Sequence, residues 1–186
     1  MHRLRGMRCY IAGSMDRVAD GGKEWRDWIT PKLQKFGIVT LNPCKKPIDI
    51  GVESIENREY RQQLIDNKDY DTLSKAMKII RITDLRMVDI SDFLIVNFNT
   101  EQFMCGTLEE VLWSNRMKRP VLLYCPQGIK NMYHWMFGVL PYQHFFETWD
   151  DLFSYLSDID SGKNTEHLKR WIFFSYDKLT PPQKKD

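Results

Sequence analysis

Short apolar segments alternate with longer amphipathic segments along most of this chain of 186 residues. Residues 7–12, 38–41, 93–98 and 120–125 are apolar runs, and residues 143–147 form a shorter fifth run. In the segments between them, apolar side chains recur every three or four residues, as in amphipathic helices. This alternation predicts a parallel sheet with helices on both faces, in which ligands bind beyond the carboxyl ends of the strands.

Helices are expected at residues 23–36, 53–68, 70–88, 107–117 and 148–157. Gly37 should end the first helix, because glycine accepts the left-handed conformation, and Thr148 should cap the last one. Pro31 should kink the first helix or mark a second start. In the fourth helix, Leu108, Val111 and Leu112 are expected to face inward.

The chain is expected to form a single α/β domain over residues 1–186. Its core would span residues 7–147, with a charged helical insertion at about 43–83 after the second strand. A C-terminal helical extension would follow at about 148–176, and residues 177–186 would form a frayed tail.

Composition excludes several classes of protein. Lys and Arg number 27 against 25 Asp and Glu, a net charge of +2 that does not predict nucleic-acid binding. No apolar run approaches the roughly 20 residues of a membrane span, and the start of the chain lacks the apolar stretch of a secretory signal, so the cytoplasm is expected. The Cys and His spacings match no metal motif, so free thiols and no metal are expected at Cys9, Cys44, Cys105 and Cys125.

Glycine, serine and basic residues follow the first strand: Gly13, Ser14, Arg17, Lys23 and Arg26. Backbone N–H groups and a hydroxyl before a helix can hold a phosphate, although a Gly-Ser pair after a strand is also an ordinary turn. Arg26 has the same two interpretations, a phosphate contact or a surface residue.

Carboxylates lie on both sides of the third strand. Glu109 and Glu110 follow Gly106 and Thr107 and are expected in the first turn of a helix, where the helix dipole favours them whether or not they have a function. Asp84 precedes the strand and could reach the same edge of the sheet, whereas Asp92, directly before the strand, is interpreted as structural.

Four short motifs occur in order: Y-I-A-G-S at residues 10–14, an aspartate pair at 84 and 92, G-T-x-x-E at 106–110 and K-R-P-V-L at 118–122. Taken together, their order and spacing resemble the nucleoside 2-deoxyribosyltransferase family and its nucleotide N-glycosidase relatives over about residues 7–140. The resemblance implies a flavodoxin-like (Rossmann-like) five-stranded parallel sheet, in agreement with the strand count.

The resemblance also implies residue roles. Glu110 would be the nucleophile, with Glu109 as the alternative, Asp84 would contact the substrate, and Tyr10 would hold the nucleophile in place. Asn131 matches a position that completes a neighbouring subunit's site in many members, so a homodimer or larger assembly is expected. Tyr10 and Asn131 could instead be a core tyrosine and a helix cap. The candidate substrate-binding residues are Gly13, Ser14, Arg17, Arg26, Gly106, Thr107 and Asn131.

An N-glycosidic bond breaks through an oxocarbenium-like sugar, which a carboxylate below the anomeric carbon can stabilise or trap. In the expected reaction Glu110 forms a glycosyl intermediate, Asp84 assists the departing base, and the 2-deoxyribosyl group passes to another base. No cofactor is required, and the substrate would be a nucleoside or nucleotide. With water as the acceptor, the protein would be a nucleoside 5′-monophosphate N-glycosidase instead.

Two positions depart from the family's pattern. Met104 stands where some transferases carry an aspartate, and Leu112 stands where glycine is usual. The first departure motivates an alternative, a nucleotide-binding module without catalysis. A further alternative, nucleic-acid binding through basic residues, is less favoured because acidic residues balance them; these are Lys32, Lys35, Lys45, Lys46 and the basic tail.

Overall fold

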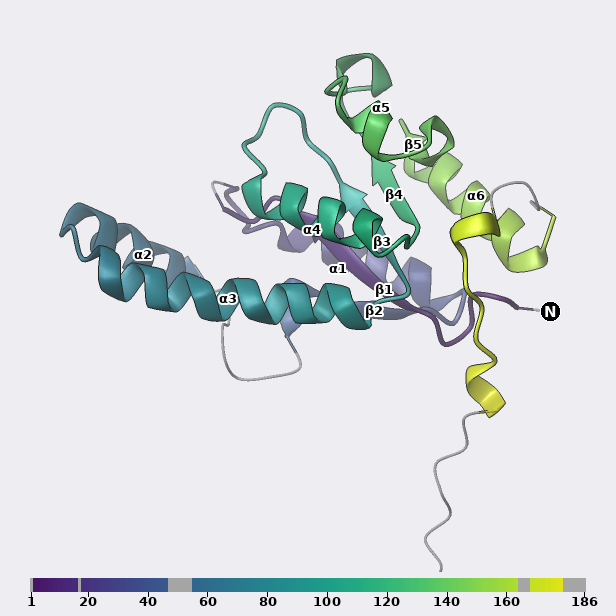
Figure 1. The fold of residues 1–186 in the computed structure, drawn as a ribbon, viewed down its shortest axis with the longest axis horizontal. Helices are drawn as coiled ribbons and strands as arrows, with labels where there is room; N and C mark the ends of the chain where they lie inside the picture. The colour runs from purple at the N-terminus through teal and green to yellow at the C-terminus, as the bar shows by residue number, and fades with distance from the viewer. Residues whose placement is uncertain (1, 17, 47–54, 164–167, 179–186) are drawn as a thin grey trace, which may run out of the picture.

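The computed structural model describes residues 2–16, 18–46, 55–163 and 168–178 and contains a five-stranded sheet (Figure 1). Its strands are β1 (Arg8–Gly13), β2 (Val39–Leu41), β3 (Phe93–Asn97), β4 (Val121–Tyr124) and β5 (Phe145–Phe146). Adjacent strands all pair in parallel, in the order β2-β1-β3-β4-β5. The expected parallel α/β architecture is confirmed, including the short edge strand.

The direction of strand addition reverses between β1 and β3. The chain leaves β1 to form β2 on one side and then returns to form β3 on the other side. β1 and β3 pair in register from Cys9 opposite Phe93 to Gly13 opposite Asn97. Because the connections leave these two strands in opposite directions, a crevice opens beyond their carboxyl ends.

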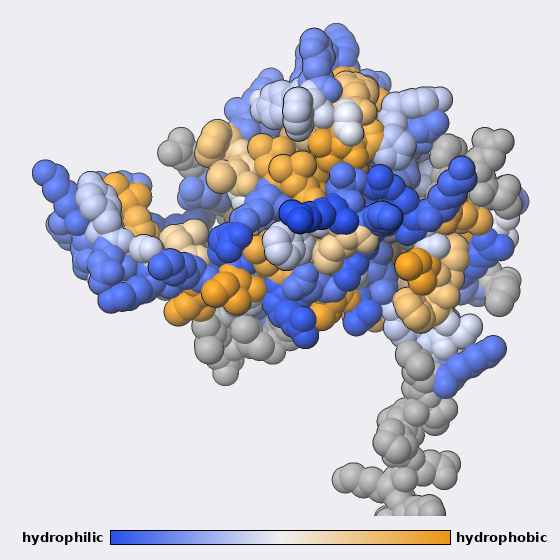
Figure 2. Space-filling view, in the orientation of Figure 1, coloured by the Kyte–Doolittle hydropathy of each residue, from blue (hydrophilic) through white to orange (hydrophobic). Residues whose placement is uncertain are grey.

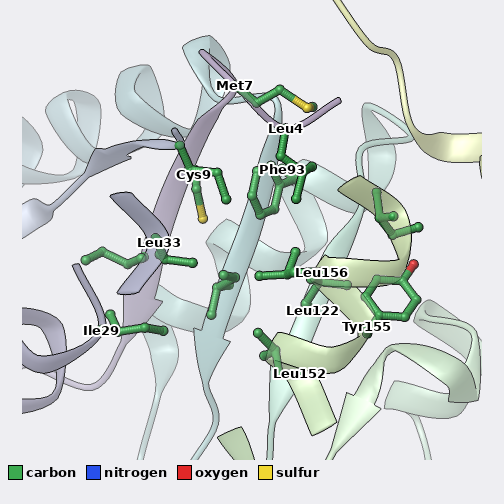
Figure 3. Close-up of a cluster of buried hydrophobic side chains, with 14 of the residues drawn as sticks. Leu4, Met7, Cys9, Ile29, Leu33, Phe93, Leu122, Leu152, Tyr155 and Leu156 are labelled. Carbon is green, nitrogen blue, oxygen red and sulfur yellow. The ribbon is translucent and has the colours of Figure 1, made fainter. Parts of the chain in front are cut away.

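Helices cover both faces of the sheet. α1 (Lys23–Gln34) and α6 (Trp149–Ser161) pack on one face, where Cys9 and Ile11 point (Figure 3). α3 (Tyr70–Ile90) and α4 (Cys105–Arg116) cover the other face, with the short α5 (Met136–Val139) at its end. Successive strand residues point to opposite faces, so Tyr10 and Ala12 lie on the side of α3 and α4.

α2 (Ile55–Asp66) lies beside α3, and both extend past the edge of the sheet (Figure 1). The Asp69 side chain accepts a hydrogen bond from the Thr72 N–H at 3.2 Å, which confirms the expected division between the two helices. The expected insertion at 43–83 ends inside α3, whose last turns carry Met87 and Val88 into the core. One helix therefore joins the insertion to the core.

Two expected helix ends are confirmed. Gly37 has φ +72°, and its N–H bonds to the Gln34 carbonyl at 2.9 Å, as in a glycine-terminated helix. The Thr148 hydroxyl accepts from the Asp151 N–H at 3.1 Å. Pro31 marks no second start, because α1 is one continuous helix held by buried residues on either side of the proline.

The start of α4 was predicted wrongly. The helix begins at Cys105, two residues before the expected start, so Gly106 and Thr107 are helical and Glu109 and Glu110 lie in the second turn rather than the first. No side chain among the described residues caps this end, so the sequence lacked the signal that usually marks a helix start. Leu112 was expected to face inward but is 45% exposed.

The segment after α6 differs from the expected helical extension. Its described residues form only two short 3₁₀ turns, Leu168–Arg170 and Tyr176–Lys178. Trp171 and Phe173 are two residues apart and both pack on the core of the α1/α6 face, which is the spacing of an extended chain. Most of the expected frayed tail lies outside the described residues.

Candidate active site

A cavity of about 540 Å³ lies beyond the carboxyl ends of β1 and β3. Its walls come from the end of β1 and the following loop, from one face of α3, and from the loop and first turns of α4. The position is the one that the reversal of strand order predicts for a ligand site. Most of the residues proposed from the sequence line this cavity, namely Tyr10, Gly13, Ser14, Arg26, Asp84, Gly106, Thr107, Glu109 and Glu110.

Tyr10 and Glu110 are in direct contact. The fully buried Tyr10 hydroxyl donates a hydrogen bond to Glu110 Oε1 at 2.6 Å. Burial raises the pKa of Tyr10 well above its ordinary value of 10.0, and the charges of Glu110 and Asp84 raise it further. The hydroxyl therefore keeps its proton near neutral pH and acts as a fixed donor to the carboxylate.

Glu109 has a different partner. Arg81 of α3 bonds to it through several N–H groups, including Nε to Glu109 Oε2 at 2.8 Å. Both side chains line the cavity and remain substantially exposed, so solvent reaches this ion pair. Of the two glutamates, only Glu110 is held by the buried tyrosine.

Asp84 projects from α3 and is paired with a lysine. Lys46 Nζ lies 2.9 Å from Asp84 Oδ1, and the side chains are 1% and 14% exposed, respectively. From the sequence, Lys46 is expected only as a possible nucleic-acid contact. The only sequence signal for its placement is its position directly after the turn that ends β2.

Arg26 organises the loop after β1. Its guanidinium donates to the carbonyls of Ile11, Gly22 and Gly13 at 3.1, 2.7 and 2.8 Å, and the residue is 1% exposed. The interpretation as a surface residue is wrong. Since three of its N–H groups bind backbone carbonyls, Arg26 fixes the shape of this side of the cavity.

Gly13 and Ser14 line the cavity beside Arg26. The Ser14 hydroxyl oxygen is buried and has no hydrogen-bond partner within the described parts of the chain. Gly22 has φ +73°, and a Cβ there would lie 2.4 Å from the Ser14 carbonyl oxygen, so this loop requires a glycine at its end.

Gly106 and Thr107 occupy the first turn of α4. A Cβ built on Gly106 would meet no atom of the described residues within 4 Å, although Gly106 lines the cavity. The missing side chain therefore leaves space for a ligand rather than for another part of the chain. Thr107 is buried under this turn.

Of the two remaining proposed residues, one lies away from the cavity and the other falls outside the described residues. Asn131 ends a 3₁₀ turn (Ile129–Asn131), is exposed, and donates from Nδ2 to the Gln127 carbonyl. It does not line the cavity of its own chain. Arg17 lies outside the described residues.

An apolar wall faces the polar residues. Met77, Ile80 and Leu85 of α3 line the cavity together with Phe103, which is 78% exposed. Met77 and Ile80 follow the three-to-four-residue spacing of apolar side chains that predicts a helix at 70–88, whereas nothing in the sequence singled out Phe103. The cavity thus combines an apolar side, a phenol donor and four carboxylates, those of Asp16, Asp84, Glu109 and Glu110. Ligand pockets commonly combine apolar walls with a few polar groups in this way.

All four cysteines carry free thiols, as expected. Within the described parts of the chain, no three Cys, His, Asp or Glu side chains are grouped as metal ligands would be. No helix in those parts is both long enough and apolar enough to cross a membrane.

By sequence, no known protein family and no curated protein matches the chain. By structure, it is similar to the 2-deoxyribosyltransferase of Bacillus psychrosaccharolyticus, with 18% identity and a TM-score of 0.52 over 80% of this chain and 95% of that one. It is also similar to the enzyme of the same name from Leishmania mexicana, with 15% identity and a TM-score of 0.53 over 82% and 97%. The chain has the fold of the 2-deoxyribosyltransferases. The fold expected from the four motifs is confirmed by this similarity.

Proposed function

We propose that the protein cleaves the N-glycosidic bond of a nucleoside and transfers the 2-deoxyribosyl group to another base, with Glu110 as the nucleophile. The observation that carries this proposal is the 2.6 Å hydrogen bond from the buried Tyr10 hydroxyl to Glu110 inside the cavity. A carboxylate held by a neutral donor keeps its negative charge and a fixed orientation. Both are needed to stabilise or trap an oxocarbenium-like sugar.

In the first step, a Glu110 oxygen bonds to C1′ of the sugar while the bond from C1′ to the base breaks. The electron pair of that bond goes to the base nitrogen, which gains a proton. In the second step, a nitrogen of the incoming base attacks C1′, the bond to Glu110 breaks, and the incoming base loses its proton. One base has replaced the other, and the proton gained in the first step is balanced by the one lost in the second.

Hydrolysis of a nucleoside 5′-monophosphate is the second candidate, and one observation favours it. The buried Ser14 hydroxyl has no hydrogen-bond partner in the described parts of the chain, and it lies beside the cavity. A phosphate oxygen would supply an acceptor for this donor. Water would then replace the incoming base in the second step.

We further propose a homodimer or larger assembly in which Asn131 reaches a neighbouring subunit's cavity. Apolar side chains gather over α4 and α5 (Figure 2), and Trp135 is 81% exposed between Asn131 and α5. A second copy of the chain would cover such a patch. Sedimentation should detect a dimer or larger species, and Trp135→Glu should dissociate it and lower activity; a fully active monomer would contradict the shared site.

The function is tested by incubating the protein with nucleosides and 5′-monophosphates, with and without a labelled free base, and separating the products by chromatography. Label in the nucleoside indicates transfer, and free sugar alone indicates hydrolysis. Saturable binding without base release would favour the non-catalytic module.

Two neighbouring variants identify the nucleophile. Glu110→Gln should abolish base release, whereas Glu109→Gln, which alters only the pair with Arg81, should retain it. Full base release by Glu110→Gln would exclude the proposed covalent step.

A further inference from the structure

Two consecutive lysines follow the end of β2 and point to different partners. The turn before them, Pro43–Lys45, is capped by the Asn42 side chain, which accepts from the Cys44 N–H at 2.9 Å. Lys45 pairs with Asp27 of α1 at 2.5 Å and remains largely exposed. Lys46 instead enters the protein and pairs with Asp84 of α3, with 1% of its side chain exposed. The turn therefore places the Lys45 side chain at the surface and the Lys46 side chain against Asp84.

Because the Lys46–Asp84 pair is buried, each of its charges depends on the other for compensation. An ammonium group removed from water is unfavourable unless a counter-charge and hydrogen bonds compensate it, and here Asp84 is a counter-charge at 2.9 Å. The attraction works in both directions, because a cation in direct contact favours the ionised form of a carboxyl group. Lys46 thus favours Asp84 as an anion.

Other charged groups surround Asp84, but their contacts differ. Glu110 shares the cavity, and its carboxylate, which accepts from the neutral Tyr10 hydroxyl, makes the local environment more negative and disfavours a second anion. Arg81 is bonded to Glu109, and Arg26 is bonded to backbone carbonyls. The remaining ionisable side chains that line the cavity are Lys78, Asp16 and Cys105. In the described parts of the chain, Lys46 is a cation in direct contact with Asp84, so it opposes the repulsion between the Asp84 and Glu110 carboxylates.

We propose that Lys46 is a positioning residue that keeps Asp84 ionised, so that Asp84 accepts a hydrogen bond from an N–H or NH₂ group of the substrate base. The inference rests on the proposed function and specifies its substrate as a base with a donor on the edge that faces Asp84. Since Asp84 then carries no proton to donate, the departing base nitrogen is protonated by water.

The decisive experiment measures kcat/KM against pH for Lys46→Met, using the nucleoside that the wild-type protein converts fastest. If Asp84 must be ionised, loss of the cation moves the acidic limb of the profile upward by about one pH unit or more, so activity falls about tenfold below that limb and recovers in alkaline buffer. If Asp84 must instead be a neutral acid, the same change would leave activity unchanged or raise it at neutral pH. An unchanged profile or raised activity overturns the proposal.

Lys45→Met is the matched control, because it removes the adjacent lysine and a surface ion pair. Its pH profile should be that of the wild-type protein. Lys46→Arg keeps the cation and should restore the position of the acidic limb. If Lys45→Met shifts the acidic limb of the pH profile as Lys46→Met does, the result would also contradict a specific role for Lys46.

Lys46→Met leaves a carboxyl group without its buried partner and can therefore impair folding. The ion pair is then tested by thermal unfolding of Lys46→Met, Asp84→Asn and the double variant. Lys46→Met and Asp84→Asn should each lower the unfolding temperature. The double variant should lower it by less than the sum of the two single decreases, because it leaves neither charge buried without its partner. Additive losses would exclude the coupling. This cycle needs no substrate, so it remains informative if the wild-type protein releases no base and the proposed function itself fails.

Discussion

Tyr10→Phe is the sharpest test of the site, because it removes one hydroxyl group and leaves the packed ring in place. The lost hydrogen bond is 2.6 Å long and joins a fully buried donor to a carboxylate. Hydrogen bonds to charged groups contribute about 1.5–3 kcal/mol. If the bond is needed to present Glu110 to the sugar, that range corresponds to a loss of roughly 10- to 150-fold in kcat/KM.

Stability should change much less than activity. The Tyr10 ring stays within the core of the α3/α4 face, and water that enters the cavity can solvate the Glu110 oxygen left behind. A net loss of about 1 kcal/mol would lower the unfolding temperature by roughly 2–4 °C in a protein of this size. The assay is therefore base release measured beside thermal unfolding of the same preparation.

Tyr155→Phe provides the matched control. Tyr155 is also a buried tyrosine, and its hydroxyl lies 3.3 Å from both Trp171 Nε1 and His144 Nε2, but it packs on the opposite face of the sheet. This variant should lower the unfolding temperature and leave kcat/KM within about twofold of wild type, since distant sites act independently. If Tyr10→Phe keeps wild-type kcat/KM, the tyrosine does not position the nucleophile and the assignment of Glu110 loses its main support.

Three further outcomes follow from single groups. Gly106→Ala should raise the unfolding temperature, because alanine is favoured over glycine in a helix by up to about 1 kcal/mol. It should also raise KM, because the added Cβ occupies open cavity space. Calorimetry and kinetics on one sample check both changes. Cys105 is exposed and lines the cavity, so alkylation at pH 8 should modify it first and a bound nucleoside should slow the reaction, as read by mass spectrometry. Cys125 should resist, because burial raises its pKa from 9.0 to about 12. Burial and the hydrogen bond to Asp92 raise the pKa of Tyr176 from 10.0 to about 12. The contribution of Tyr176 to stability is therefore complete below pH 10 and is lost as the pH rises through 12. In urea titrations, Tyr176→Phe should reduce this fall in the free energy of unfolding between pH 10 and 12, and a fall as large as that of the wild-type protein would contradict the assignment.

The fold could be predicted because its signals are local. The apolar runs became the five strands, and Gly37 and Thr148 mark helix ends by their own backbone or side-chain chemistry. The start of α4 could not be predicted, because Met104 and Cys105 supply no capping side chain and Gly106 suggests a loop when only the sequence is considered. That error shifted Glu110 by half a turn relative to the helix end but did not remove it from the site.

Contacts across the cavity were less predictable. Arg26 is polar and lies in a helix, so the sequence suggested exposure, yet the loop after β1 folds over it and uses its N–H groups. Lys46 and Asp84 are far apart in the chain, and only the packing of the β2 turn against α3 joins them. Neither burial nor a pairing of this kind leaves a periodic pattern in the sequence.

Glu110 and Asp84 have partners of different charge, and this difference supports the separate roles proposed for them. Glu110 accepts from the Tyr10 hydroxyl, a neutral donor that leaves the negative charge available to a developing sugar cation. Asp84 faces the Lys46 ammonium, which balances its charge and leaves it suited to recognition of a base rather than to attack on the sugar. Acids that share a cavity but differ in environment commonly divide the chemistry in this way.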